Sequence, residues 1–193
     1  MRKMRSTFRR NFSKSFQLDK VCGGSDTYRR IMAYIYFKDG YAFATDAYIG
    51  ARVPIVELIH DISKEETEFL NRRYIHKNIY KKILSYDLMS IQEDGILCTD
   101  IDSKTGVLFK FAVLDNEFPP IWTVLENAMK EPIEAVEKIA FDYKFLSDLC
   151  SGLGFGGTQS VLEFRTANRA IIVRSKDRDV LSLGLLMPVM LND

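Results

Sequence analysis

The sequence predicts an α+β fold whose helices lie on one side of a continuous sheet. Three observations support this class. A helix candidate followed by antiparallel apolar strands occurs three times along the chain. Two of these units contain an Asp-Gly pair between strands, Asp39-Gly40 and Asp94-Gly95, which is a strong hairpin signal. Helices that alternate with runs of antiparallel strands, and not with single parallel ones, are typical of α+β proteins.

The first unit begins with a short helix candidate around Ser13–Val21, which leads through Gly23-Gly24 into an apolar strand, Ile31–Phe37. Asp39-Gly40 then predicts a tight turn, and Tyr41–Asp46 is the return strand.

An added helical connection follows this unit at about residues 56–71. It has two parts, Val56–Ser63 and Lys64–Asn71. Ser63 and Glu66 have the spacing of a capping box, in which each side chain accepts a hydrogen bond from the backbone of the other residue.

The second unit starts with a clearer helix. Its apolar residues recur at helical spacing on one face, while Lys77 and Lys81 are one turn apart on another; the apolar set is Ile75, Ile79, Ile83 and Leu84. A hairpin over Leu88–Asp100 and a strand over Val107–Val113 complete the unit.

An extended, non-helical joint is expected at Phe118-Pro119-Pro120, because proline disfavours helix in the residue before it. The third unit then repeats the order. Phe145, Leu146, Leu149 and Cys150 form the apolar face of a helix, which the Gly-rich stretch Gly152–Gly157 ends. The expected strands are Val161–Arg165, Ala170–Arg174 and Leu181–Met187. We therefore divide the chain into residues 1–120, with two half-units, and residues 121–193, a further half-domain.

Composition places the chain among ordinary globular proteins. It has 193 residues, of which 47% are hydrophobic and 27% charged. No apolar run is long enough to span a bilayer, and no apolar segment follows the basic N-terminus as in a signal peptide. The three cysteines, Cys22, Cys98 and Cys150, have no zinc-site spacing. We expect a reduced, metal-free protein of the cytoplasm that needs no cofactor.

Charge is distributed unevenly. Residues 1–30 carry nine basic and two acidic residues, a net charge of +7, while the whole chain has a net charge of only +1. A basic end on an acidic body can hold a polyanion. A solvated N-terminal segment explains the same pattern.

No catalytic motif is present. The stretch Gly152–Gly157 follows a helix and lacks the Lys-Ser/Thr of a phosphate-binding loop. Asp100 and Asp102 could be a metal pair, but acidic residues after a hairpin are usually solvated. No nucleophile–histidine–acid set stands out. We therefore expect a protein that is not an enzyme.

The last strand is followed by Met187-Pro188, where sheet pairing must stop because proline has no N–H to donate. Methionines on such a tail suit a surface that accepts several peptides. An ordinary core strand end is the alternative.

Four stretches, in their order along the chain, resemble the bacterial DNA polymerase III beta subunit, the sliding clamp. Asp39–Asp46 is similar to the clamp strand that ends in Ala-Thr-Asp-Gly, and Glu117–Ile121 to the acidic-aromatic-proline joint that leaves a clamp domain. Ile139–Leu149 is similar to the helix entry of the last clamp domain, and Leu186–Leu191 to the terminal Met-Pro-Met-Arg-Leu. A clamp protomer has six half-domains, and this chain supplies about three.

The resemblance implies a first working surface, on which basic side chains of the inner helices hold duplex DNA through its phosphates. The candidates on or beside the first two helices are Arg9, Arg10, Lys14, Lys20, Lys77, Lys81 and Lys82. In a clamp ring such helices line the central hole that holds DNA. In the third helix here, Lys144 is offset by Asp142 and Asp148, so the lining would not be uniformly basic.

It also implies a pocket for short peptides of polymerases and other clamp-binding proteins. Carried over by motif, the pocket comprises Thr45, Ala47, Tyr48, Ile49, Pro119, Val124, Leu186, Met187, Pro188 and Val189. Ala47-Tyr48-Ile49 stands where the family has Gly-His-Arg, and Met190 stands where it has its terminal Arg. The polar rim of the pocket, and with it the preference for partners, should therefore differ.

These features predict a sliding-clamp-like tethering or processivity factor that forms a homo-oligomer on duplex DNA and does not enter membranes. The alternative is a clamp-like interaction module, an adaptor or competitor, that keeps the peptide pocket and does not encircle DNA.

Overall fold

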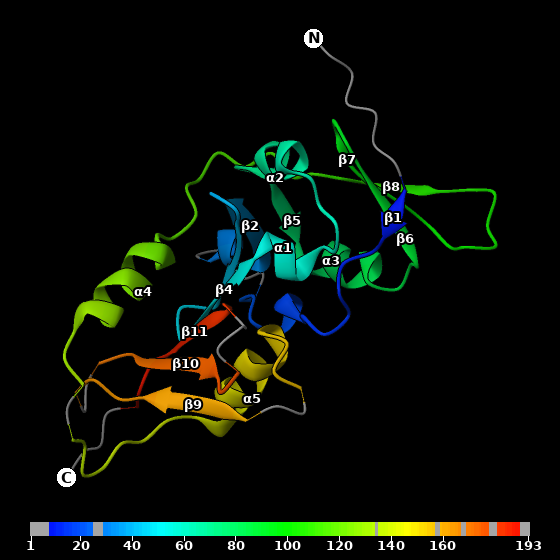
Figure 1. Ribbon diagram of the computed structural model, residues 1–193. Helices are drawn as coiled ribbons and strands as arrows, with labels where there is room; N and C mark the ends of the chain where they lie inside the picture. The colour runs from blue at the N-terminus through cyan, green and yellow to red at the C-terminus, as the bar shows by residue number, and fades with distance from the viewer. Residues whose placement is uncertain are drawn as a thin grey trace.

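The computed structural model describes residues 8–24, 29–133, 135–156, 159–166, 169–177 and 181–189. Their strands form a four-stranded antiparallel sheet of order β1-β6-β7-β8 and a seven-stranded antiparallel sheet of order β5-β2-β3-β4-β11-β10-β9 (Figure 1). An isolated bridge between Tyr74 and Ala112 links the two sheets.

The first two repeat units exchange their leading strands. The first unit consists of β1 (Arg9–Arg10), the 3-10 turns η1 (Leu18–Lys20) and η2 (Arg30–Ala33), and the strands β2 (Tyr34–Lys38), β3 (Tyr41–Thr45) and β4 (Ile49–Pro54). The second consists of β5 (Tyr74–His76), α3 (Lys77–Ile83), β6 (Leu88–Gln92), β7 (Gly95–Thr99) and β8 (Val107–Lys110). The leading strand β1 pairs with β6 of the second unit, and β5 pairs with β2 of the first. The two units therefore interlock.

The third unit continues the sheet of the first. It consists of α5 (Tyr143–Gly152), β9 (Ser160–Glu163), β10 (Ile171–Ser175) and β11 (Leu183–Leu186). The strand β11 pairs antiparallel with β4, with Leu186 opposite Ile49 and Leu185 opposite Gly50. Alternate residues of each strand point to opposite faces, so β10 and β11 contribute to two separate cores.

The larger core lies on the face covered by η1, α3 and α5, and includes Ile35, Phe37, Ala51 and Leu186. Close approach fixes α5 here, since a Cβ on Gly184 would come within 2.6 Å of the Leu153 side chain. The smaller core lies on the opposite face under α4 (Ile121–Lys130), which Figure 1 shows on the far side of the strands from α5. Its buried residues are Leu125, Ala128, Ala170, Ile172, Leu183 and Leu185.

The connecting helices are α1 (Ile55–Leu58) and α2 (Lys64–Leu70). The predicted capping box is confirmed: the Glu66 N–H donates to Ser63 Oγ at 3.2 Å, and the Ser63 N–H donates to Glu66 Oε2 at 3.0 Å. The first hairpin is confirmed as well. Asp39 and Gly40 both have positive φ, as a type I′ turn requires.

Several element boundaries differ from the sequence prediction. The helix expected around Ser13–Val21 is reduced to the 3-10 turn η1, because the Ser13 N–H donates to the Leu58 carbonyl and the Gln17 N–H to that of Ser151. These long-range hydrogen bonds replace helical ones.

Two further differences concern strands. Residues 30–33 form the turn η2, so the strand expected at Ile31–Phe37 starts at Tyr34, and Ile75 belongs to β5 and not to the helix α3. The second hairpin turns at Glu93-Asp94, while Gly95 is paired opposite Gln92 in β7. A Cβ on Gly95 would lie 2.1 Å from the Phe109 carbonyl oxygen, so Gly95 is required for close packing and not for the turn.

Candidate peptide groove and basic face

The junction of β4 and β11 brings together most of the residues expected to bind peptides. Thr45 ends β3, Ile49 begins β4, and Leu186 ends β11 directly opposite Ile49. All three side chains are buried. They lie beneath the surface of the junction and cannot contact a ligand directly.

The loop from Thr45 to Ile49 is held by its own side chains. Asp46 Oδ1 accepts hydrogen bonds from the N–H groups of Tyr48 and Ile49, both at 2.8 Å. Thr45 Oγ1 accepts from the Ala47 N–H at 3.1 Å and donates to the Ile49 carbonyl at 2.7 Å. These bonds hold Ala47 at a φ of +81° and leave the Tyr48 side chain exposed.

The terminal tail runs beside this loop. The Met187 N–H donates to the Tyr48 carbonyl at 2.9 Å. Ladder pairing of β11 ends at Leu186, which agrees with the expectation that it stops beside Pro188. The tail is nevertheless not free, because Val189 forms an isolated bridge with Ala140, its N–H donating to the Ala140 carbonyl at 2.7 Å. Met190 lies outside the described residues.

The helix α4 forms a third side of the junction. It begins immediately after the Pro119-Pro120 joint, which is non-helical as expected but turns tightly and is not extended at Pro120, where ψ is 59° and the Ile121 N–H donates to the Pro119 carbonyl at 2.7 Å. Gly50 pairs with Leu185 across the sheet. A Cβ placed on Gly50 would lie 3.7 Å from Ile121 Cδ1 of α4. Val124 is on the same first turn, and its side chain is exposed.

The apolar surface that remains open at this junction is small. Its exposed members are Tyr48, Val124, Met187 and Val189, with relative exposures of 50%, 46%, 36% and 54%. We call these four residues the groove rim. Leu183 and Leu185, on the same sheet face, are covered by α4. The open surface therefore suits a short segment with few apolar anchors.

The seven basic candidates differ in exposure and in whether their charges are engaged within the fold. Lys81 and Lys82, in the last turn of α3, are exposed, as are Lys14, Lys20 and Arg10. Lys77 donates from Nζ to the Gly23 carbonyl at 2.7 Å, so its ammonium group is engaged within the fold. Lys20 Nζ lies 3.5 Å from Ser151 Oγ.

Arg9 lies in β1, and its charge is engaged within the fold. Its guanidinium pairs with Glu66 at 2.6 Å and donates to the Asp61 carbonyl, and both side chains of the pair are largely buried. This ion pair ties β1 to α2, so the structure gives Arg9 a place in the fold and not on the basic face. We call the four exposed lysines among the candidates the basic face: Lys14, Lys20, Lys81 and Lys82.

His76 caps the N-terminus of α3. Its Nδ1 accepts a hydrogen bond from the Asn78 N–H at 3.2 Å, which requires that nitrogen to be unprotonated. Burial, and then the nearby Lys77 ammonium, lower the pKa of His76 below its ordinary value. The neutral cap therefore supports the helix that carries Lys81 and Lys82.

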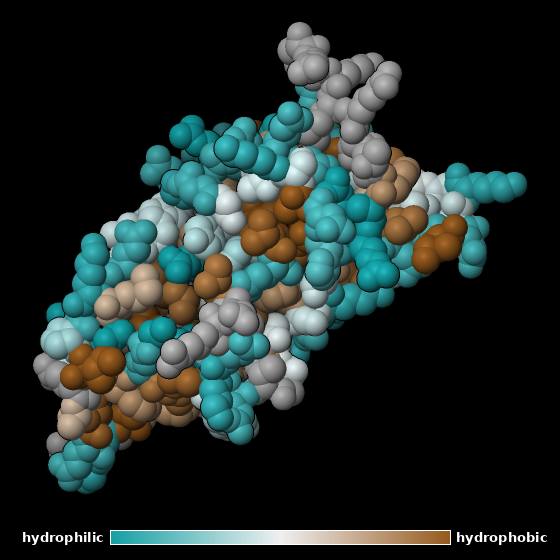
Figure 2. Space-filling model, in the orientation of Figure 1, coloured by the Kyte–Doolittle hydropathy of each residue, from teal (hydrophilic) through white to brown (hydrophobic). Residues whose placement is uncertain are grey.

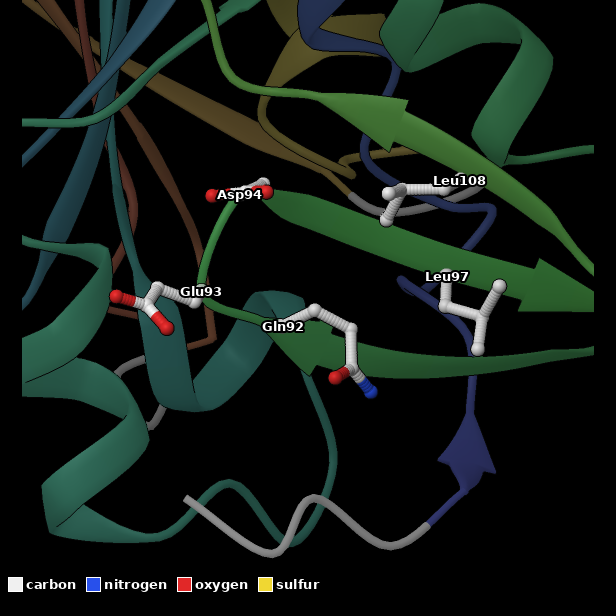
Figure 3. Close-up of a pocket in the computed structure, with 5 residues that line it drawn as sticks. All are labelled: Gln92, Glu93, Asp94, Leu97 and Leu108. Atoms are coloured by element: carbon white, nitrogen blue, oxygen red, sulfur yellow. The ribbon is translucent and has the colours of Figure 1, made fainter. Parts of the chain in front are cut away.

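One hollow of the surface lies away from both candidate surfaces. Figure 3 shows it at the β6–β7 hairpin, where it has a volume of about 320 Å³. It is lined by Gln92, Glu93, Asp94, Leu97 and Leu108. None of the predicted site residues lines it.

Within the described part of the chain, no three His, Cys, Asp or Glu side chains meet in a group that could hold a metal ion. Within the same residues, every helix is too short or too polar to cross a bilayer.

Comparison with solved structures identifies the fold. The chain superposes on a DNA polymerase sliding clamp from Bacillus subtilis with a TM-score of 0.60 at 14% identity, covering 100% of this chain and 66% of that one. A sliding clamp from Bartonella birtlesii gives 0.58 at 14% identity, covering 99% and 67%. The beta subunit of DNA polymerase III from Thermotoga maritima gives 0.57 at 11% identity, covering 93% and 62%. No protein-family model and no curated protein sequence matches the chain.

The chain therefore has the sliding-clamp fold, as the sequence resemblance implied, and it spans about two thirds of the length of the clamps it matches.

The helix α4 is the part of the site that the sequence reading missed. Its apolar residues, Ile121, Leu125, Ala128 and Met129, follow one another at helical spacing directly after two prolines. That spacing, with a helix start after Pro120, could have identified it.

Proposed function

We propose that this protein is a sliding-clamp-like tether that holds duplex DNA without reading its sequence and binds short peptide segments of replication or repair proteins. The observation that supports it most is the fold match to sliding clamps over 93–100% of the chain. Tethering would raise the effective concentration of a bound enzyme at its DNA.

The basic face supports the DNA part of the proposal. Lys81 and Lys82 are exposed on α3, whose seven residues carry three lysines and no acidic residue. The corresponding helix α5 carries Lys144 and Asp148, which cancel. We therefore expect α3 to make the principal phosphate contacts, with α5 contributing little.

The groove rim supports the peptide part. Its four exposed apolar side chains come from three segments that are distant in the sequence: the loop before β4, the tail after β11, and α4. Tyr48 and Met187 are adjacent through a backbone hydrogen bond, and neighbouring exposed apolar side chains are typical of a site that buries a few anchors of a partner.

The DNA part is tested by fluorescence anisotropy with a labelled 30-base-pair duplex, at several salt concentrations and with two unrelated sequences. We expect equal affinity for both sequences and a linear loss of log affinity with log salt concentration. The double substitution Lys81→Glu and Lys82→Glu should lower the salt slope by about two and weaken binding roughly ten-fold at moderate salt.

Lys104→Glu with Lys110→Glu is the matched control, because both lysines are exposed on or beside β8 and the change in net charge is the same. Equal losses in the two double variants would indicate attraction by net charge alone. Affinity that ignores both salt and the Lys81 and Lys82 changes would reject the DNA part of the proposal.

A further inference from the structure

The groove rim is bordered by a side-chain stack that the peptide proposal has not used. The rings of Tyr48 and Phe145 are nearly parallel, with centroids 5.4 Å apart and an angle of 9° between their planes. The guanidinium carbon of Arg29 lies 5.6 Å from the centre of the Tyr48 ring. The Tyr48 ring of the rim therefore has a cationic side chain, that of Arg29, stacked against it.

The stack is held in place by backbone contacts on both sides. Tyr48 is fixed by the hydrogen bonds of its N–H to Asp46 and of its carbonyl to the Met187 N–H. Phe145 lies in the first turn of α5, where the Asp142 side chain accepts from the Lys144 N–H as N-cap. Because the backbone on both sides of the stack is held and the two rings pack on each other, the guanidinium on Tyr48 has less freedom to lose when it binds an anion.

Arg29 is exposed and is in none of the ion pairs found among the described residues. The two carboxylates that belong to the stack's own segments, Asp46 and Asp142, already accept backbone N–H groups. The guanidinium therefore retains donors for a ligand, and it holds them beside exposed apolar side chains.

We propose that the groove rim recognises an acidic and apolar peptide, in which a carboxylate binds Arg29 while one or two neighbouring apolar side chains contact Tyr48, Met187 and Val189. This inference rests on the peptide groove of the proposed function and specifies its partner. A guanidinium matches a carboxylate with two parallel hydrogen bonds, so the charged residue also fixes the direction of the peptide. The covered positions Leu183 and Leu185 limit the segment to a few residues.

The test is a selection from a library of random octapeptides displayed on phage, followed by anisotropy measurements on the selected peptide. The wild-type protein should enrich peptides with Asp or Glu next to aliphatic or aromatic residues. Arg29→Gln should abolish the acidic preference and weaken the selected peptide about five-fold, while Arg30→Gln should leave both unchanged. Arg30 is the matched control because it is the adjacent exposed arginine, and among the described residues no aromatic contact or ion pair is found for it.

Each outcome separates this inference from the proposed function. Enrichment of apolar peptides without acidic residues, or equal losses in the two arginine variants, would overturn the inference and leave the groove intact. A selection that enriches no peptide would overturn the inference and the peptide part of the proposed function together. The duplex-binding assay would still decide the DNA part separately.

Discussion

Ala47 is one of four non-glycine residues in the described part of the chain that have a positive φ. Its φ of +81° lies in the left-handed region, where a Cβ is unfavourable and glycine is not. The hydrogen bonds of Thr45 and Asp46 nevertheless hold it there, and the resulting loop presents Tyr48 at the rim. The backbone strain at this one residue is thus part of the loop conformation that leaves the Tyr48 side chain exposed.

We expect Ala47→Gly to raise the free energy of unfolding by roughly 0.5 kcal/mol, because relief of the left-handed strain exceeds the added entropy of the unfolded chain. Urea unfolding followed by circular dichroism measures the change. Ala44→Gly is the control, since Ala44 is buried in β3 with ordinary φ and its replacement should be destabilising. A loss of stability in both variants would show that Ala47 is not strained.

The helix α3 depends on a titratable cap. Since the pKa of His76 is lower in the folded protein than its ordinary value of 6.5, the unfolded chain binds more protons as the pH falls. The stability that the neutral cap contributes is fully present above pH 6.5. It is lost progressively as the pH falls from there through the lowered pKa of the folded state.

We expect His76→Asn to remove this pH dependence, because Asn is a good N-cap that does not titrate. Between pH 8 and pH 5.5 the urea midpoint should decrease more in the wild type than in the variant. The corresponding difference in the free energy of unfolding should not exceed about 1 kcal/mol, the typical contribution of an N-cap. Parallel behaviour of the two proteins between these pH values would show that the His76 cap does not control α3.

Local signals predicted most elements, and long-range contacts explain the failures. The capping box at Ser63 and the turn at Asp39-Gly40 depend on residues within a few positions of each other, and both are present. The segment from Ser13 to Val21 has helical spacing, yet its backbone bonds to α1 and α5, which no local pattern reveals.

At the site, the motif resemblance predicts that Tyr48 and Met187 share one surface, and the structure places them side by side through a backbone hydrogen bond. It could not show that Leu186 and Ile49 are covered, since burial depends on how β4 and β11 meet. Nor could it place Arg29 over Tyr48, because the two residues are far apart in the sequence and belong to no shared motif.

The whole molecule has an open strand edge toward each end of its length. The strand β8 is the last of the four-stranded sheet and β9 the last of the seven-stranded one, and Figure 1 shows them toward opposite ends. Val107 and Leu108 on β8 and Val161 on β9 are exposed. Figure 2 shows apolar surface beside the β6–β8 sheet, at the right of the view. Edges with apolar side chains favour strand pairing with another chain.

We expect head-to-tail association through these edges, as the proposed clamp requires. Light scattering over a concentration series, at low and moderate salt, should show a discrete closed oligomer, and Leu108→Arg or Val161→Arg should shift it toward monomer. Val56→Arg is the control, because Val56 is exposed on α1 and lies on neither edge. A monomer at every concentration would argue against encirclement and favour the adaptor function.

The pairing of β4 with β11 also has a consequence during synthesis. About 130 residues separate the end of β4 from the end of β11, so β4 is made long before its partner strand. At about 5–20 residues per second, the ribosome takes roughly 7 to 26 seconds to supply β11. During that interval the nascent chain presents an unpaired strand edge and the uncovered side chains of Ile49, Ala51 and Val53. Chaperone protection of the growing chain is therefore needed most in this interval, before the third unit emerges.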